Sequence, residues 1–171
     1  AEVKIWPMIE TPTAIFEVRR LAAHPRVAVL IMGTNDLAKE LRSPIVPGRH
    51  PLIPHLATAL LAGREAGKVV IDGVNNDVKD PDGFAAECVQ GMEMGFDGKT
   101  LIHPSQVDPA NETWSPSADE VEHARRVIAA FDEAVAAGKG VVTVDGRMIE
   151  NLHVESARRV LAIDEAIVAS R

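Results

Sequence analysis

The sequence predicts an α/β fold with a parallel sheet. Four short apolar runs alternate with four stretches of helical periodicity, which is the pattern of strands joined by helical crossovers. The second run, residues 27–32, is apolar without a break, as in a strand buried on both faces. After Pro104 this alternation stops, so the rest of the chain is expected to form an appendage.

Each element of the core has its own signals. Ile15, Val18 and Ala22 share one helical face, and a proline follows at position 25. Pro7 weakens the first strand, because proline lacks the N–H that a central strand donates. Four prolines predict a loop over residues 42–54. The predicted strands are 4–9, 27–32, 68–71 and 98–102. The predicted helices are 13–23, 36–41, 55–65 and 84–94.

The tail has a different organisation. Ser117 and Glu120 have the spacing of a capping box, which predicts that a long helix begins there and ends at Gly138. Residues 141–150 form a predicted hairpin, since Asp145-Gly146 is a strong two-residue turn signal. A last helix is expected over residues 153–170. We therefore divide the chain into a βα core, residues 1–116, and an arm of helix, hairpin and helix, residues 117–171.

Bulk composition restricts the function classes. The chain has 171 residues, 46% of them hydrophobic, and a formal net charge of −7, which argues against nucleic-acid binding. No apolar run approaches the ~20 residues of a spanning helix, so no membrane association is expected. The single Cys88 favours a cytoplasmic setting and is interpreted as core packing. The chain enters an apolar run by its third residue without an initiator methionine, so we expect a segment to precede it.

Two acidic residues stand where the first two predicted strands end. Glu10 closes the first apolar run, and Asp36 follows the second across a short turn. Carboxylates at the ends of neighbouring parallel strands can share a Mg²⁺ ion, which takes oxygen ligands and keeps positions for water and substrate. The alternative is that each acid caps the helix that follows it.

Three further positions could carry chemistry. The turn Gly33-Thr34-Asn35 could hold a carboxylate through backbone N–H groups at a helix N-terminus, or be an ordinary connection. Asp145 could be a general acid/base on a mobile arm, or only a turn residue. His103 follows the end of the fourth strand. It could line the same site, or it could have only a structural role.

Polar residues also crowd the exit of the third strand. Asp72, Asn75, Asn76 and Asp77 could contact a ligand, although loops of this kind are usually solvated. The sequence contains no Walker loop, GxGxxG, HExxH, CxxC or GxSxG motif, which disfavours common nucleotide, zinc and serine-hydrolase sites.

Five ordered motifs give the chain a family resemblance. It resembles the HpcH/HpaI aldolase family, in the branch of citrate lyase β-subunits and malyl-CoA lyases. The motifs are Met8-Ile9-Glu10-Thr11-Pro12, Met32-Gly33-Thr34-Asn35-Asp36-Leu37-Ala38, Gly95-Phe96-Asp97-Gly98-Lys99, Ile102-His103-Pro104-Ser105-Gln106-Val107 and Val144-Asp145-Gly146-Arg147-Met148-Ile149.

The resemblance implies a TIM barrel, and this chain would supply four βα units, which form the second half of that barrel. From the residues alone, a four-stranded open sheet is the alternative. It implies a Mg²⁺ site (Mn²⁺ is the substitute) at Glu10 and Asp36, and an oxo-acid carboxylate held by Gly33, Thr34 and Asn35. It makes Asp145 the catalytic acid of the arm, acting in a neighbouring subunit of a homo-oligomer, a trimer or hexamer.

The reaction that the resemblance implies is reversible C–C cleavage between an acyl-CoA, or another acyl thioester, and a 2-oxo acid. Many relatives carry Glu where this chain has Asn35, and the first half of the family's barrel is absent from the sequence. Two alternatives stay open. One is a 2-oxo acid aldolase that needs no CoA, and the other is a non-catalytic half-barrel completed by a partner chain.

Overall fold

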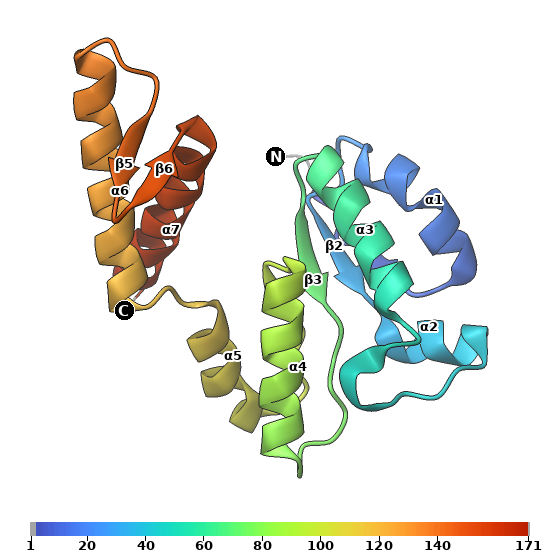
Figure 1. Cartoon of the computed structure of the whole chain (residues 1–171). Helices are drawn as coiled ribbons and strands as arrows, with labels where there is room; N and C mark the ends of the chain where they lie inside the picture. Colours follow the sequence, from blue (N-terminus) through green and yellow to red (C-terminus); the bar gives the residue numbers. More distant parts are fainter. Residues whose placement is uncertain (1–2, 171) are drawn as a thin grey trace. The chain divides into compact units, whose positions relative to one another are not determined.

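The computed structural model describes residues 3–170, which form two compact units, residues 3–114 and residues 115–170. Figure 1 shows the two units in sequence colours. Each has a hydrophobic core of its own: one core surrounds the buried Leu30 and Leu56, and the other surrounds Val127 and Val154. Each unit is described by itself below.

The first unit is built on a four-stranded parallel sheet. Its strands lie side by side in sequence order, β1 (Met8–Ile9), β2 (Val29–Met32), β3 (Val69–Asp72) and β4 (Gly98–Lys99). The α/β class and the parallel sheet are thereby confirmed. β1 is shorter than predicted, because Pro7 interrupts it and Ile5 makes only an isolated bridge to Val27.

Four helices alternate with these strands. α1 (Pro12–Ala22) and α3 (Ile53–Glu65) lie side by side and bury Ile15, Val18 and Leu56 in the main core. They are visible together in Figure 1. α2 (Thr34–Leu41) follows β2 after a single residue, and α4 (Pro81–Met94) follows the long loop after β3. The helices agree with the predicted ones within three residues at each boundary.

Residues 104–114 differ from the prediction. A 3₁₀ turn, η2 (Pro104–Gln106), leads directly into α5 (Val107–Trp114), which the sequence pattern did not indicate. The helix is short, polar and carries Pro109 in its first turn, so local propensity gives little sign of it. Tertiary contacts hold it instead, since the Trp114 indole N–H donates to the Phe96 carbonyl at 2.8 Å.

The second unit follows the predicted order of helix, hairpin and helix. α6 (Ala118–Ala136) starts with the capping box of Ser117 and Glu120, and α7 (Asn151–Ala169) starts two residues earlier than expected. Between them, β5 (Val142–Val144) and β6 (Arg147–Ile149) form an antiparallel hairpin. Asp145 and Gly146 both have positive φ, 50° and 76°, as a type I′ turn requires.

Candidate active site

The carboxyl ends of β1 and β2 place Glu10 against Gly33. The Gly33 N–H donates to the Ile9 carbonyl at 3.1 Å, which continues the pairing of the two strands. A Cβ at position 33 would overlap the Glu10 Cβ and stand 2.6 Å from Glu10 Oε2. Only glycine therefore lets the Glu10 side chain lie across the turn that starts α2.

Neither predicted metal ligand caps a helix. The N-cap of α1 is Thr11, whose hydroxyl accepts from the Ala14 N–H at 3.0 Å, and the N-cap of α2 is Gly33. Asp36 is exposed in the first turn of α2, where its charge also suits the helix dipole. Within residues 3–170, Glu10 and Asp36 have no hydrogen-bond or ion-pair partner. Both carboxylates are thus uncommitted.

The donor set at this edge suits a hard divalent cation. Two carboxylates without other partners are the oxygen ligands that Mg²⁺ uses together with water and substrate. No group of three or more His, Cys, Asp or Glu side chains gathers anywhere in the described part of the chain. A metal ion at Glu10 and Asp36 would therefore take its remaining ligands from water and substrate.

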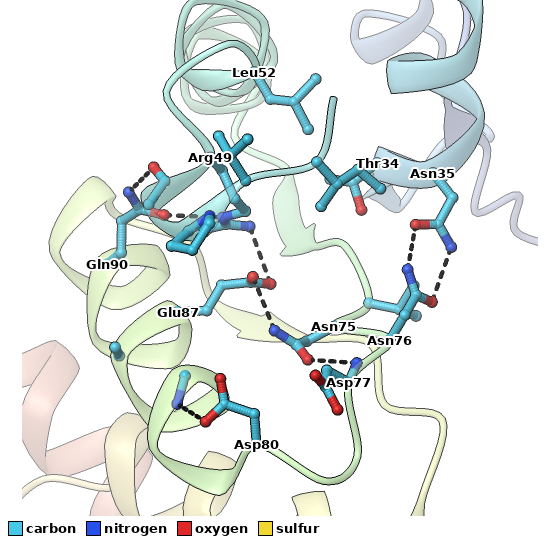
Figure 2. A pocket seen from close by; sticks show the side chains of 17 residues that line it. Thr34, Asn35, Arg49, Leu52, Asn75, Asn76, Asp77, Asp80, Glu87 and Gln90 are labelled. Carbon is cyan, nitrogen blue, oxygen red and sulfur yellow. Dashed lines mark hydrogen bonds and ion pairs between the residues drawn. The ribbon is translucent and has the colours of Figure 1, made fainter. Parts of the chain in front are cut away.

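The predicted anion-binding turn is fixed by the loop that follows β3. Thr34 is buried, and its hydroxyl contacts Gly73 so closely that a Cβ at position 73 would overlap it. Asn35 forms a reciprocal amide pair with Asn76, with N–O distances of 3.1 and 2.6 Å, as drawn in Figure 2. The first N–H groups of α2 lack intrahelical acceptors, so they are available to an anion.

Asp72 is a residue whose role sequence reasoning missed. The sequence leaves it as a ligand contact or as part of a solvated loop, but it is the last residue of β3 and is completely buried. Arg49 Nη1 donates to both of its oxygens, at 2.7 and 2.8 Å, and Lys99 Nζ donates at 3.0 Å. The Lys99 ammonium also donates to Glu87 at 2.6 Å.

This buried charge cluster, Arg49, Asp72, Glu87 and Lys99, joins the 42–52 loop to β3, β4 and α4. Arg49 is itself 3% exposed and has a positive φ of 50°. The sequence contains one sign of this cluster. Asp72 directly follows the apolar run Val69-Val70-Ile71, and a buried acid of this kind needs a partner such as Lys99 in the adjacent strand.

Asp145 lies at the tip of the hairpin in the second unit. Its Oδ2 accepts from Arg126 Nη2 at 3.0 Å and lies 3.2 Å from His123 Nδ1, both on α6. The hydrogen bond and charge of Arg126, and then His123, lower the pKa of this exposed carboxyl. Asp145 is therefore held as the carboxylate.

Replacing Arg126 by alanine is expected to raise the pKa of Asp145 toward its ordinary value. Because the folded pKa is depressed, the ion pair stabilises the fold above the unfolded pKa of Asp145, and this stabilisation is lost as pH falls through the folded pKa. A ¹³C NMR titration of the Asp145 carboxyl measures the change. Arg125→Ala, next along the helix and 3.9 Å from Asp164, is the control and leaves the titration unchanged. Equal titrations in both variants contradict the assignment.

His103 and Cys88 have structural surroundings. His103 caps η2, where its Nδ1 accepts from the Ser105 N–H at 3.2 Å. Cys88 is completely buried beside Phe84 and Ala110, as predicted. Burial raises the pKa of the Cys88 thiol to about 11, with the neighbouring charges making smaller contributions.

Cys88 is accordingly expected to resist thiol reagents in the native protein. At pH 8 only about one thiol in 10³ would be ionised, and the side chain is shielded. Dithionitrobenzoate should react slowly with the native chain and at the rate of a free thiol after urea unfolding. Equally fast labelling in both states would show that Cys88 is accessible.

Comparison with known proteins identifies the family of this chain. Residues 1–104 match the family model described as HpcH/HpaI aldolase/citrate lyase. The chain belongs to that family. It is 52% identical over 168 residues to a (3S)-malyl-CoA thioesterase of Cereibacter sphaeroides, covering 98% of this chain and 59% of that relative. It is 35% identical over 155 residues to the citrate lyase subunit beta of Escherichia coli K12, covering 90% and 51%.

Solved structures of this family share the fold. CitE of Mycobacterium tuberculosis, in complex with magnesium, acetoacetate and coenzyme A, aligns with a TM-score of 0.76 at 25% identity, over 93% of this chain and 60% of CitE. A citrate lyase from Burkholderia xenovorans LB400 aligns with a TM-score of 0.84 at 24% identity, over 98% and 54%. The chain thus spans 59% of the length of the first of these curated relatives and 51% of the second. The described helices include none long and apolar enough to cross a membrane.

Proposed function

We propose that the whole protein is a Mg²⁺-dependent carbon–carbon lyase, which joins an acyl-CoA to a 2-oxo acid or reverses that step. The observation that carries the proposal is the pair of uncommitted carboxylates, Glu10 and Asp36, at the ends of adjacent parallel strands. Its relatives include malyl-CoA and citrate enzymes, and CitE has been crystallised with magnesium and coenzyme A. The sequential strand order supports a half-barrel that the rest of the protein completes.

In this proposal each part of the site has one task. Glu10 and Asp36 hold the metal ion, which when bound polarises a carbonyl oxygen as a Lewis acid. The backbone N–H groups of Thr34 and Asn35 hold the oxo-acid carboxylate at the start of α2, while the Gly33 N–H, which donates to the Ile9 carbonyl, fixes the turn. The pair Asn35–Asn76 keeps this turn in place.

Asp145 is proposed as the proton carrier, in the active site of a neighbouring subunit. In condensation its carboxylate takes the α-proton of the acyl thioester, and the resulting enolate carbon forms the new bond to the oxo-acid carbonyl carbon. In cleavage a base takes the proton of the substrate's hydroxyl group, that bond breaks to give the oxo acid and the thioester enolate, and protonated Asp145 returns a proton to the α-carbon. Because Arg126 and His123 lower the pKa of Asp145, release from them would make the carboxylate a stronger base.

A second candidate is hydrolysis of the thioester, favoured by the relatives named (3S)-malyl-CoA thioesterase at 50–52% identity. Both reactions could use the same malyl-CoA, but their products differ. Carbon–carbon cleavage leaves the thioester intact and gives acetyl-CoA and glyoxylate. Hydrolysis adds water and gives malate and free CoA thiol.

Product analysis of the complete protein with malyl-CoA and Mg²⁺ tests both candidates. Glyoxylate, trapped as its phenylhydrazone, supports the lyase when it forms without an equal release of free thiol. Free thiol with malate supports the thioesterase. Cleavage of a free hydroxy-oxo acid, but not of malyl-CoA, would indicate a CoA-independent aldolase. If neither malyl-CoA nor citryl-CoA is turned over, the proposed function is wrong.

A further inference from the structure

The two oxygens of the Asp145 carboxylate have different surroundings. Oδ2 accepts from Arg126 Nη2 at 3.0 Å and lies 3.2 Å from His123 Nδ1. A carboxylate oxygen can only accept, so Nδ1 is the ring nitrogen of His123 that carries a proton toward it. Oδ1 has no hydrogen-bond or ion-pair partner within residues 3–170. The second unit therefore holds this carboxylate by one oxygen and leaves the other open.

The backbone that carries Asp145 is fixed inside the second unit. The type I′ turn sets the φ angles of Asp145 and Gly146 at 50° and 76°. The strands on either side of the turn bury Val144 and Ile149 in one core with Val127 of α6. The tip of the hairpin thus lies beside α6, and the side-chain torsions of Asp145 are the freedom that remains to its carboxylate.

Both partners of Oδ2 come from one face of α6. His123 and Arg126 are three residues apart, which places their side chains next to each other on a helix. Glu122 Oε1, one turn earlier, lies 3.9 Å from Arg126 Nη1, so the guanidinium has a carboxylate beside each of its two Nη atoms. Two N–H donors from one helix thus converge on a single oxygen of Asp145.

Holding Asp145 in this way has two opposite effects on a base. The hydrogen bond and charge of Arg126 lower the pKa of the carboxyl, which weakens it as a base. Fixing its position favours proton transfer, because a misplacement of ~1 Å can cost ~10²-fold in rate. The ion pair is about half exposed, so it adds little to the stability of the fold. Two donors on one oxygen, with the other oxygen bare, are the arrangement that positioning needs.

We propose that Arg126, together with His123, is a positioning residue for the proposed reaction, because it holds Oδ2 and so makes Oδ1 the oxygen that takes and returns the α-proton. In condensation the bond between the α-carbon of the acyl thioester and its hydrogen breaks. The proton goes to Oδ1, and the electron pair stays on the thioester as the enolate. The inference rests on the proposed function, because it needs Asp145 to be the proton carrier.

Arg126→Ala in the complete protein tests this role in the condensation of acetyl-CoA with glyoxylate. On the pH plateau, kcat should fall at least tenfold while the KM for acetyl-CoA stays within about threefold, because the base is misplaced and substrate binding is not. Condensation needs the carboxylate, and the pKa of Asp145 rises toward its ordinary value in the variant, so the loss of kcat with decreasing pH should begin at a higher pH. An unchanged or raised kcat, or a lower kcat with an unmoved pH profile, overturns the proposal.

Rescue experiments separate positioning from general damage. Arg126→Lys keeps a positive charge with N–H donors and should recover part of kcat, and millimolar guanidinium should partly restore Arg126→Ala. Arg125→Ala, next along the helix and 3.9 Å from Asp164, is the matched control and should stay within about twofold of the native protein. If neither Arg126→Lys nor guanidinium restores any rate, or if Arg125→Ala is slowed equally, the positioning role is wrong.

Asp145→Asn distinguishes failure of this inference from failure of the proposed function. This variant should be inactive and unresponsive to guanidinium, because an amide cannot take the α-proton. If Asp145→Asn is inactive but Arg126→Ala equals the native protein, only the positioning role is wrong. If Asp145→Asn keeps native activity, another residue carries the proton, and the inference fails together with that assignment. If the native protein forms no malyl-CoA, the proposed function fails and the inference fails with it.

Discussion

Replacing Glu10 by alanine in the complete protein is expected to lower Mg²⁺-dependent cleavage by about 10³-fold or more while the fold persists. Stabilisation by a catalytic metal is worth several kcal/mol, and each ~1.4 kcal/mol corresponds to tenfold in rate. Glu10 makes no hydrogen bond or ion pair within residues 3–170, so its loss should leave the unfolding temperature almost unchanged. Steady-state rates and Mg²⁺ calorimetry measure the two effects.

Glu40→Ala is the matched control for this experiment. Glu40 is an exposed carboxylate near the end of α2, away from the first turn that carries Asp36. The control should retain full activity and Mg²⁺ affinity. Retained activity in Glu10→Ala, or lost activity with unchanged Mg²⁺ affinity, would show that Glu10 is not a metal ligand.

The second large effect is on stability. Asp72→Ala is expected to lower the free energy of unfolding of the first unit by ~3–5 kcal/mol, because Arg49 and Lys99 would remain buried without the carboxylate that they share. Urea unfolding followed by tryptophan fluorescence measures this, since both tryptophans, Trp6 and Trp114, lie in the first unit.

An exposed ion pair provides the comparison. Glu65 on α3 pairs with Arg19 on α1, but both side chains are largely in water. Solvent screens such pairs, so Glu65→Ala should cost far less than Asp72→Ala. If the two variants unfold at the same urea concentration, the buried charge cluster does not stabilise the unit as inferred.

Periodicity and strand-end rules were sufficient for most of the fold. Continuous apolar runs marked β2 and β3, and the turn signal Asp145-Gly146 located the hairpin. These features are local, so a single sequence carries them. α5 was missed because the Trp114–Phe96 hydrogen bond and the packing of Ala110 with residues of α4 hold it, and the partners in both contacts lie outside the helix.

The candidate site shows the same division. The approach of Glu10 to Gly33 could be predicted, because parallel strands end at one edge of a sheet, and Asp36 follows in the first turn of α2. The partnership of Arg49 with Asp72 could not be predicted, because it joins a loop to a strand 23 residues away and no rule of spacing pairs them.

The reciprocal pair of Asn35 and Asn76 has a consequence for how the site responds to its surroundings. Both side chains are neutral amides, so neither titrates, and ionic strength has little influence on their two hydrogen bonds. Ion pairs in the same place would loosen with salt or acid. The start of α2 and the loop after β3 are instead joined by a pair of amides that responds little to either.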